Sequence, residues 1–444
     1  MESGAWRRLN CISRHFLTQN EANEILHLNC SSAPNIFRHV DSEPIVLGGM
    51  VMDIHATSSI PARPRTTTPG KVQYVKGGVA RNIAECMSKL GTKPFMISVI
   101  GYDMAGVLLS ILRTCFVTLK RGNLLLEYWE SSGLATEGIQ RRKDIGTPVV
   151  CNFFDAKGEV AAGVASVEAI ELFLTQEWIQ KFSRNISSAP ILVVDANLNP
   201  QSLEASCQMA ADSGVPVWFE PVSIAKSKKV ASVVKYVTVA SPNEDELIAM
   251  ANALSYGDRF RPIQREVNGG SKRSIQCLFQ MLKPAILVLL EKGVKIVVLT
   301  LGSEGVFLCS KDGYNSVQNH LENIRTSSFG IELYATVNSR LPSDEIVSAV
   351  NRLHVLHFPS LVTSVVRLTG AGDCLVGGIL ASLCSGLNLR QSIAVGIAAA
   401  KASVEVESNV PTEYCLTKIA GFCFADDARL VYSSAKVVCD EPLV

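Results

Sequence analysis

The 444-residue sequence lacks several features that would each indicate a particular class of protein. Lysine and arginine almost balance aspartate and glutamate, and a net charge of +1 gives no basic field that would recruit nucleic acid. No apolar run reaches the roughly 18 residues of a membrane-spanning helix, so we expect a soluble protein with no membrane partner. The thirteen cysteines include no C-x-x-C pair, which argues against a zinc site and a disulfide framework.

Two common nucleotide-binding signatures are absent as well. The segment Gly269–Lys272 does not have the spacing of a Walker A loop. A second Gly-rich stretch, beginning at Gly370, reads G-x-G-x-x-x-x-G and not the dinucleotide-binding G-x-G-x-x-G. A phosphate group bound by this chain would therefore need another arrangement of backbone amides.

From Pro44 onward, short β-branched runs alternate with longer helix-like patterns. The first of these is a strand-like run, PIVLGGMVMDI, and an amphipathic pattern, GVARNIAECMSKLG, follows it. Later strand-like runs include APILVVDANL and VKIVVLTLG. Such alternation predicts an α/β fold, with a mostly parallel central sheet between two layers of helices. Ligands of such sheets bind beyond the carboxyl ends of the strands, where the polar residues described below are expected.

The most informative segment runs from Thr369 to Asp373. A β-branched run, Val362–Val366, predicts a strand before it, and an apolar stretch from Cys374 predicts a helix after it. Small residues let backbone approach a ligand closely, and the free N–H groups of a helix N-terminus favour an anion. The Asp373 carboxylate would stand beside that anion, where it could accept a proton from an attacking hydroxyl. Phosphoryl transfer to an alcohol needs both groups, although Gly-rich turns also commonly join strands to helices.

The T-G-A-G-D motif at residues 369–373 resembles the C-terminal signature of the PfkB (ribokinase-like) sugar and nucleoside kinases. The resemblance implies that Asp373 is the general base and that the Gly370, Ala371 and Gly372 amides form an anion hole. It also implies ATP as phosphate donor and a ribokinase-like three-layer α/β/α fold with a small β lid over the substrate.

The resemblance covers nearly everything outside an N-terminal extension. We expect the following organisation: an extension at 1–43, a kinase domain at 44–438 with lid segments at about 54–76 and 147–165, an insertion at 107–122 and a surface insertion at about 312–359.

The substrate end is assigned to the N-terminal part of the domain. Asp53 sits at the end of the first predicted strand of the central sheet, where a carboxylate can accept hydrogen bonds from sugar hydroxyls. Gly77 and Gly78 allow close backbone approach, and Asn82 on the next helix offers a donor and an acceptor. A lone Gly-Gly pair is more often a loop, but the four residues together are similar to the N-terminal PfkB pattern.

The resemblance places the nucleotide end in the second half of the chain. Asn243 and Glu246 form the family's N-x-x-E motif, which organises Mg²⁺ mostly through water, although an acidic helix start would look the same. Other residues match the turn along the ATP phosphates: Thr300, Gly302, Gly305 and, next to the anion hole, Thr369. Arg367 departs from the Asp or Asn of many relatives that helps to bind a monovalent cation, so K⁺ activation is an open question.

Four segments resemble pseudouridine kinases in particular: KGGVARNIAECMSKLG, DANL, FEPVS and SPNEDEL. That resemblance implies transfer of phosphate from ATP to the 5′-hydroxyl of pseudouridine, with lid residues such as Val150 or Asn152 facing the base. Two alternatives stay open: a PfkB kinase acting on ribose, fructose or another nucleoside, and a catalytically inactive PfkB-like binding protein. A homodimer formed through the lid is also open.

The N-terminal extension carries an arginine-containing pattern. Arg8-Leu9, five residues, and His15-Phe16 resemble the type-2 peroxisomal targeting signal R-L-x5-H-L, with Phe16 in place of the usual leucine. We therefore expect a peroxisomal protein, with a cytoplasmic one as the alternative.

Overall fold

The computed structural model describes most of the chain beyond the N-terminal extension. The described residues are 42–61, 65–103, 124–154, 160–255, 257–263, 274–311, 330–342, 351–421 and 427–443. Residues 41–444 form one compact unit. The predicted extension, apart from its last two residues, and the predicted insertion at 107–122 lie outside the described residues.

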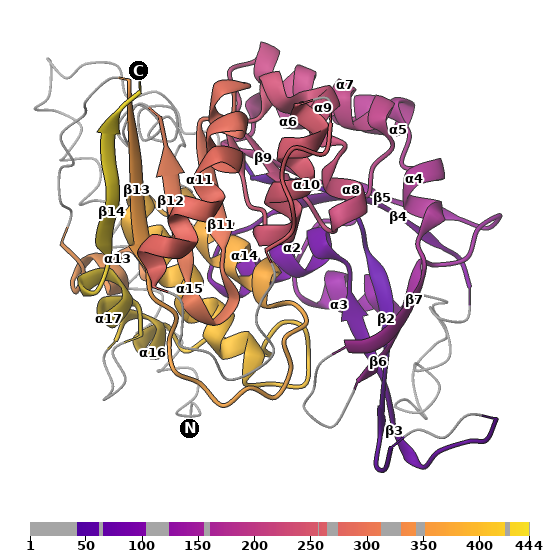
Figure 1. The fold of residues 1–444 in the computed structure, drawn as a ribbon. Helices are drawn as coiled ribbons and strands as arrows, with labels where there is room; N and C mark the ends of the chain where they lie inside the picture. The colour runs from indigo at the N-terminus through magenta and orange to yellow at the C-terminus, as the bar shows by residue number, and fades with distance from the viewer. Residues whose placement is uncertain are drawn as a thin grey trace, which may run out of the picture. The chain divides into compact units, whose positions relative to one another are not determined.

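A ten-stranded sheet forms the centre of this unit (Figure 1). Its strands follow the spatial order β14-β13-β12-β11-β10-β9-β8-β1-β4-β5. All neighbours from β11 to β5 pair in parallel, whereas β12, β13 and β14 are added antiparallel at one edge. The strands are β1 Ile45–Leu47, β4 Phe95–Gly101, β5 Ile139–Arg142, β8 Leu192–Asp195, β9 Val217–Glu220, β10 Val239–Ala240, β11 Ile296–Thr300, β12 Val306–Ser310, β13 Arg352–Phe358 and β14 Lys436–Pro442.

Helices cover both faces of this sheet, because successive strand residues point to opposite sides and both sides are apolar. Val46 packs into one core, and its neighbours Ile45 and Leu47 pack into the other. The first face carries α2 Val79–Lys89, α3 Leu124–Ser131, α13 Ile331–Asn338, α14 Ala371–Cys384, α15 Leu389–Val404, α16 Leu416–Ala420 and α17 Asp427–Ser433. The second carries α4 Glu168–Phe173, α5 Gln176–Gln180, α6 Ser183–Ser188, α7 Pro200–Asp212, α8 Ile224–Ser227, α9 Val230–Val233, α10 Glu244–Leu254 and α11 Ile275–Glu291.

Helix α14 lies between α2 and α15, and glycines make the close approach possible. A Cβ at Gly377 would stand 2.6 Å from Cβ of Cys86 on α2. A Cβ at Gly378 would stand 2.9 Å from Cα of Gly396 on α15. Packing therefore explains the small residues of these helices, and it fixes the start of α14 relative to α2.

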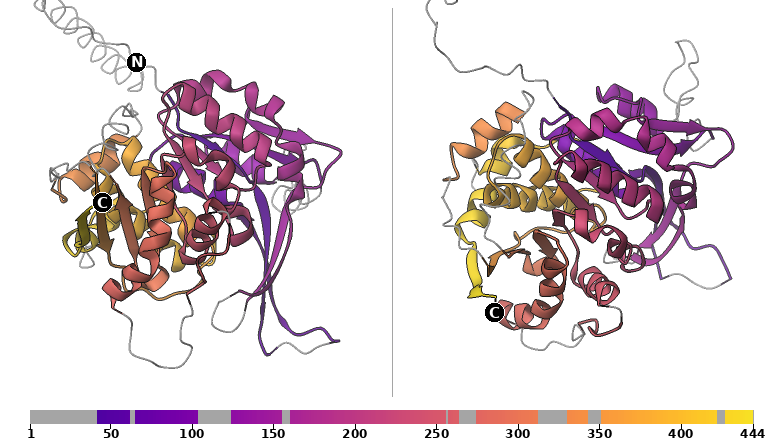
Figure 2. Two further views of the ribbon diagram at one scale, coloured as in Figure 1. Left: turned by 45° about the horizontal axis from the view of Figure 1, so that its top comes forward. Right: turned by 90° about the horizontal axis from the view of Figure 1, so that it is seen from above.

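A separate four-stranded sheet of order β3-β2-β6-β7 confirms the predicted β lid. Its strands are β2 Val51–Ser58, β3 Gly70–Gly77, β6 Val149–Phe154 and β7 Val160–Ser166. Figures 1 and 2 show these strands leaving the central sheet together. Strand β2 pairs antiparallel with β3 and parallel with β6, which joins the two predicted lid segments.

Three details of the prediction are wrong. The run PIVLGGMVMDI is two strands, β1 and β2, because the chain leaves the central sheet at Gly48, whose Cβ position lies 2.3 Å from the Asp195 carboxyl carbon. Residues Val362–Val366 form no strand, and the Val362 side chain is 98% exposed. The predicted surface insertion at 312–359 includes strand β13 of the central sheet and helix α13, whose Leu333 and Val337 are buried.

None of the described helices is both long enough and apolar enough to cross a bilayer.

Candidate active site

The structure brings the predicted base and a predicted substrate residue into direct contact. Nδ2 of Asn82 on α2 donates a hydrogen bond of 2.6 Å to Oδ2 of Asp373, in the first turn of α14. The two residues are 291 positions apart in sequence. The packing of α2 against α14 is what places them together. The predicted substrate end and the predicted catalytic turn are therefore one site.

The Asn82 amide is held in this orientation by its neighbour Arg81. The Arg81 guanidinium donates to Oδ1 of Asn82, which leaves Nδ2 to donate to Asp373. Arg81 is itself fixed by an ion pair with Glu85, one turn along α2. Burial alone would raise the pKa of Glu85, but the charges of Arg81 and Lys89 outweigh it and lower that pKa to about 2. The Glu85 carboxylate thus stays ionised and keeps Arg81 in place.

Burial changes the acidity of the candidate base. It raises the pKa of Asp373 from 3.8 to about 7, and the nearby Asp53 and Asp195 carboxylates also raise it. The hydrogen bond from Asn82 and the charge of Arg81 act in the opposite direction. A carboxyl with a pKa near neutrality can accept a proton and release it again, as a general base must.

Gly370 forms the turn that begins α14. Its φ of 87° lies in the left-handed region, and a Cβ there would stand 2.3 Å from the Asn409 carbonyl oxygen. Only glycine fits such a position without displacing its neighbours. By contrast, a Cβ at Gly372 would meet nothing within 4 Å, so the first turn of α14 is open beside that residue. Ala371 is the first residue of α14, and Thr369 directly precedes Gly370.

Asp53 lies on lid strand β2 and not at the end of a central strand as predicted. Its Oδ2 accepts a 2.7 Å hydrogen bond from Nδ2 of Asn409, in the loop after α15. Gly77 makes room for this carboxylate, because a Cβ there would stand 2.2 Å from the Oδ2 atom. Burial raises the pKa of Asp53 to about 6, against the lowering effects of Asn409 and Arg81.

A second buried carboxylate, Asp195 at the end of β8, organises the turn below the lid. It accepts hydrogen bonds from the backbone N–H groups of Gly49 at 2.8 Å and Ala80 at 3.3 Å. Gly78, the N-cap of α2, packs on the same turn, since its Cβ would stand 2.4 Å from the Gly49 carbonyl oxygen. Gly78 therefore shapes the start of the helix that carries Asn82.

The predicted nucleotide residues gather at the ends of β10 and β11. Asn243 caps α10 and forms a reciprocal capping box with Glu246. Asn243 also forms a parallel bridge with Thr300 at the end of the neighbouring strand. Gly302 and Gly305, both with positive φ, form the following turn. Four of the five predicted ATP-binding residues therefore lie at this edge of the sheet, whereas Thr369 directly precedes the start of α14.

Two acidic side chains, Glu220 and Glu246, interact electrostatically near the ends of β9 and β10. Burial raises the pKa of Glu220, at the end of β9, well above its ordinary value, and the charges of Glu246 and Asp373 raise it further. Burial also raises the pKa of Glu246. The described residues contain no group of three or more metal-ligating side chains. A cation placed here would consequently keep much of its water, which suits Mg²⁺.

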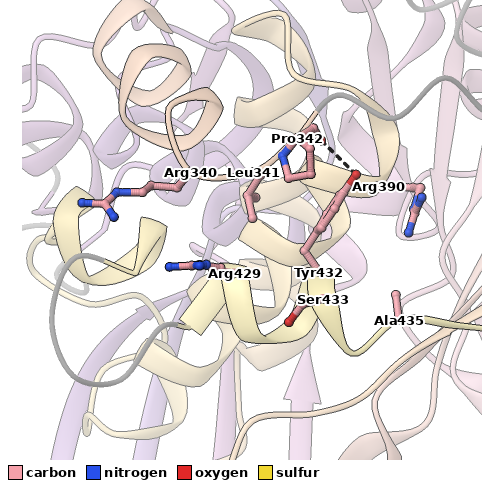
Figure 3. A pocket seen from close by; sticks show the side chains of 8 residues that line it. All are labelled: Arg340, Leu341, Pro342, Arg390, Arg429, Tyr432, Ser433 and Ala435. Carbon is pink, nitrogen blue, oxygen red and sulfur yellow. Dashed lines mark hydrogen bonds between the residues drawn. The ribbon is translucent and has the colours of Figure 1, made fainter.

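The structure also contains a cavity that no predicted site residue lines (Figure 3). Its volume is about 340 Å³, and it lies between α13, α15 and α17. The figure shows the Arg340 and Arg429 side chains extending to one side of Tyr432 and Arg390 extending to the other. The hydroxyl of Tyr432 donates to the Pro342 carbonyl at 2.9 Å.

Several residues of the site were not found from the sequence. Asn409 belongs to no recognisable motif. Arg81 lies in the KGGVARNIAECMSKLG segment and His55 in a predicted lid segment, but neither had been assigned a role. Asp195 had a usable signal, since it begins the DANL segment at the end of a strand. Glu220 likewise ends a strand, in the FEPVS segment.

Comparison with known proteins places the chain in a family. Residues 43–323 and 346–412 match the pfkB family carbohydrate kinases. A pseudouridine kinase of Arabidopsis thaliana is 49% identical over 399 residues, which cover 89% of this chain and 98% of the relative. A pseudouridine kinase of Escherichia coli is 21% identical over 367 residues, covering 82% and 92% of the two chains.

Solved structures support the same fold. The ribokinase of Arabidopsis thaliana complexed with ribose and ATP superposes with a TM-score of 0.56 at 16% identity, covering 86% of this chain and 99% of that one. Ribokinase from Cryptococcus neoformans in complex with ADP gives 0.57 at 20% identity, with coverages of 86% and 100%. The fold is therefore the ribokinase-like three-layer arrangement. The match over most of the chain and the 49% identity to a full-length relative show that this protein belongs to the pfkB family of carbohydrate kinases.

Proposed function

We propose that this protein transfers the γ-phosphate of ATP to the 5′-hydroxyl of pseudouridine, giving pseudouridine 5′-phosphate and ADP. The assignment of pseudouridine as the substrate is supported by the 49% identity to a pseudouridine kinase over 98% of that relative. The single observation that carries the chemistry is the contact of Asn82 with Asp373 at the open N-terminal turn of α14. An inactive binding protein would have no need of a carboxylate with a pKa near 7 at that point.

The reaction follows from the chain's own groups. Asp53 and Asn82 hold ribose hydroxyls and place the 5′-oxygen beside Asp373. As the bond to phosphorus forms, Asp373 accepts the proton of that hydroxyl, and ADP leaves with the bonding electron pair. The N–H groups at Gly370, Ala371 and Gly372 stabilise the charge on the transferring phosphoryl oxygens. Asn243, Thr300, Gly302, Gly305 and Thr369 position the nucleotide.

The residues beside Glu246 fit Mg²⁺. Glu246 is buried and Glu220 is partly buried, both have raised pKa values, and a cation would supply positive charge beside them. Glu246 would hold it through water, because its carboxylate already accepts the Asn243 N–H at 2.9 Å. When bound, Mg²⁺ neutralises the charge that develops on the phosphates.

The lid supplies candidate contacts to the base. Strand pairing places Val150 opposite Asp53 and Asn152 opposite His55 on neighbouring strands. Side chains of directly paired residues share one face of a sheet, so both lid residues lie on the same face as Asp53. We propose that Asn152 hydrogen-bonds the polar edge of the base.

A substrate panel tests the proposal. Purified protein with ATP and Mg²⁺ is given pseudouridine, uridine, ribose or fructose, ADP release is measured, and NMR locates the phosphate on the product. We expect the highest kcat/KM with pseudouridine and attachment at the 5′-oxygen. Preference for ribose or fructose would support the second candidate, another acceptor on the same fold, and no turnover of any acceptor would support a binding protein.

We further propose that the kinase needs no potassium. The Arg367 guanidinium is buried and supplies a fixed positive charge next to the turn at Gly370. Rates measured in sodium, potassium and tetramethylammonium chloride at equal ionic strength should then agree within about twofold. A strong dependence on potassium would contradict this proposal.

We propose that the protein forms a homodimer through the lid, so that a second copy of the chain is its partner besides the substrates. The lid face opposite Asp53 is apolar, and four of its side chains are at least half exposed, which favours burial against a second copy. These are Val72, Tyr74, Phe153 and Val164. Analytical ultracentrifugation should show a dimer for the wild type and a monomer for Tyr74→Glu. A monomeric wild type would refute the proposed dimer.

A further inference from the structure

A buried arginine and histidine connect the lid to the loop before the anion hole. The guanidinium of Arg367, in the loop after β13, contacts Nδ1 of His55 on lid strand β2. Both residues pack on Phe154: the Arg367 guanidinium carbon lies 4.4 Å from the ring centroid, and the His55 ring meets it edge-on at 5.0 Å. Arg367 is 7% exposed and His55 is 1% exposed, so water does not compete for this contact.

This contact determines which nitrogen of His55 carries the proton. A guanidinium only donates hydrogen bonds, so Nδ1 of His55 must accept and the ring's proton must be on Nε2. Burial and the positive charge of Arg367 lower the pKa of His55 to about 4, so the ring is neutral near pH 7. A neutral ring with a fixed Nε2–H is therefore present in the lid.

The Nε2–H of His55 is next to the proposed ribose-binding carboxylate. Nε2 lies 3.8 Å from Oδ2 of Asp53 and, although buried, it has no hydrogen-bond partner in the described part of the chain. Nε of Arg367 and Oδ1 of Asn409 are likewise buried and unpartnered. Asn409 donates to the same Asp53 oxygen. Buried polar atoms without partners are rare, and here three of them belong to residues connected to one carboxylate.

We propose that Arg367 and His55 are positioning residues for acceptor binding: Arg367 fixes the tautomer of His55, and the Nε2–H of His55 orients Asp53 toward the sugar hydroxyls. The proposal rests on the role of Asp53 in the proposed function. Both residues lie on β2, so a small rotation of either side chain would close the 3.8 Å gap to a hydrogen bond. The arrangement connects the lid to the catalytic turn, because Arg367 is only three residues from Gly370.

Kinetics of two variants test this role. Arg367→Met removes the donor and the charge but keeps the stem, and His55→Phe removes both ring nitrogens but keeps a ring on Phe154. We expect each to raise the KM of the sugar or nucleoside acceptor at least tenfold, with the KM of ATP changed less than threefold. His55→Phe keeps the Arg367 charge and should also leave kcat changed less than threefold. Arg367→Lys should restore part of the acceptor affinity. The double variant should resemble either single one, since both residues act through Asp53.

A matched control separates positioning from simple attachment of the lid. Lys71 on β3 forms a 2.8 Å ion pair with Glu407 in the loop after α15, and it also joins the lid to the body without contacting Asp53. Lys71→Ala should leave the acceptor KM within twofold. An equal increase for Lys71→Ala, or equal increases in both KM values for the Arg367 and His55 variants, would overturn the proposal.

A spectroscopic measurement needs no folded Arg367 variant. In ¹⁵N-histidine-labelled wild-type protein, with His55 assigned by its loss in His55→Phe or by selective labelling, Nε2 should be protonated and Nδ1 unprotonated from pH 6 to 8. The opposite tautomer would overturn the proposal. Because the KM values are measured with whichever acceptor the wild type phosphorylates, failure of the pseudouridine assignment would be recognised separately.

Discussion

At the scale of single residues, the acidity of Asp373 leads to a pH prediction. Its carboxyl must be ionised to accept a proton, and its pKa is raised to about 7. We expect kcat/KM to fall as pH decreases below about 7, approaching tenfold per unit. Asn82→Ala removes a hydrogen bond that favours the ionised form, so the midpoint should move to higher pH.

Initial rates between pH 5 and 9, at low concentrations of the acceptor, measure this profile. A midpoint near the ordinary carboxyl value of about 4, or a midpoint that moves to lower pH in Asn82→Ala, would contradict the assignment of the limb to Asp373.

Single residues also show which parts of the site can be predicted from the sequence alone. The T-G-A-G-D motif predicted Asp373 as the base, because the motif combines a turn, a helix start and a carboxylate within five residues. Asn409 could not be found in this way. It contacts Asp53 across 356 positions, and no local pattern encodes a contact that depends on the packing of the lid against a distant loop.

At the scale of elements, the N-terminus of α14 supports a contrast between two glycines. Gly370→Ala would put a side chain at φ 87° and within 2.3 Å of the Asn409 carbonyl oxygen, so we expect it to lower the free energy of unfolding by about 1–3 kcal/mol or more. Gly372→Ala meets open space, and we expect the free energy of unfolding to change by less than about 1 kcal/mol.

The effect on activity should differ from the effect on stability for Gly372→Ala. The open space beside Gly372 is where we propose that the phosphate approaches, so Gly372→Ala should lower kcat/KM at least tenfold despite its intact fold. Urea unfolding and steady-state kinetics check both statements. A stable and fully active Gly372→Ala would show that the phosphate binds elsewhere.

The strand predictions differed in quality for a physical reason. Buried parallel strands such as β8 and β11 are continuous apolar runs, and they were predicted. The run Val362–Val366 has the same residue types but lies in an exposed loop. β-Branched residues favour strands only where they pack against neighbouring side chains, and this run does not. The separation of β1 from β2 depends on the contact of Gly48 with Asp195, which is distant in sequence.

At the scale of the whole molecule, the fold class was predictable because the alternation of strands and helices extends through most of the chain. The antiparallel pairing of β12, β13 and β14 was not predicted. The residues of β13 had been assigned to the surface insertion, so no strand was expected between β12 and β14. The family match is interrupted between residues 323 and 346, inside that predicted insertion.

We also propose that the N-terminal extension directs the protein to peroxisomes. Its pattern is Arg8-Leu9 and His15-Phe16, outside the described residues. Residues 1–43 fused to a fluorescent protein should colocalise with a peroxisomal marker in eukaryotic cells, and Arg8→Ala with His15→Ala should abolish this. A diffuse signal from the unaltered fusion would refute the proposal and favour the cytoplasmic alternative.

The most direct test of the central claim is the single-turnover rate of phosphate transfer from ATP to pseudouridine in the wild type and in Asp373→Asn. The substitution keeps the size of the side chain, and it removes a partly buried carboxyl whose raised pKa makes ionisation unfavourable, so the variant should be at least as stable as the wild type at pH 8. We predict that its transfer rate falls by about 10² to 10⁴ while nucleoside binding persists. A variant that transfers phosphate at the wild-type rate would contradict the account.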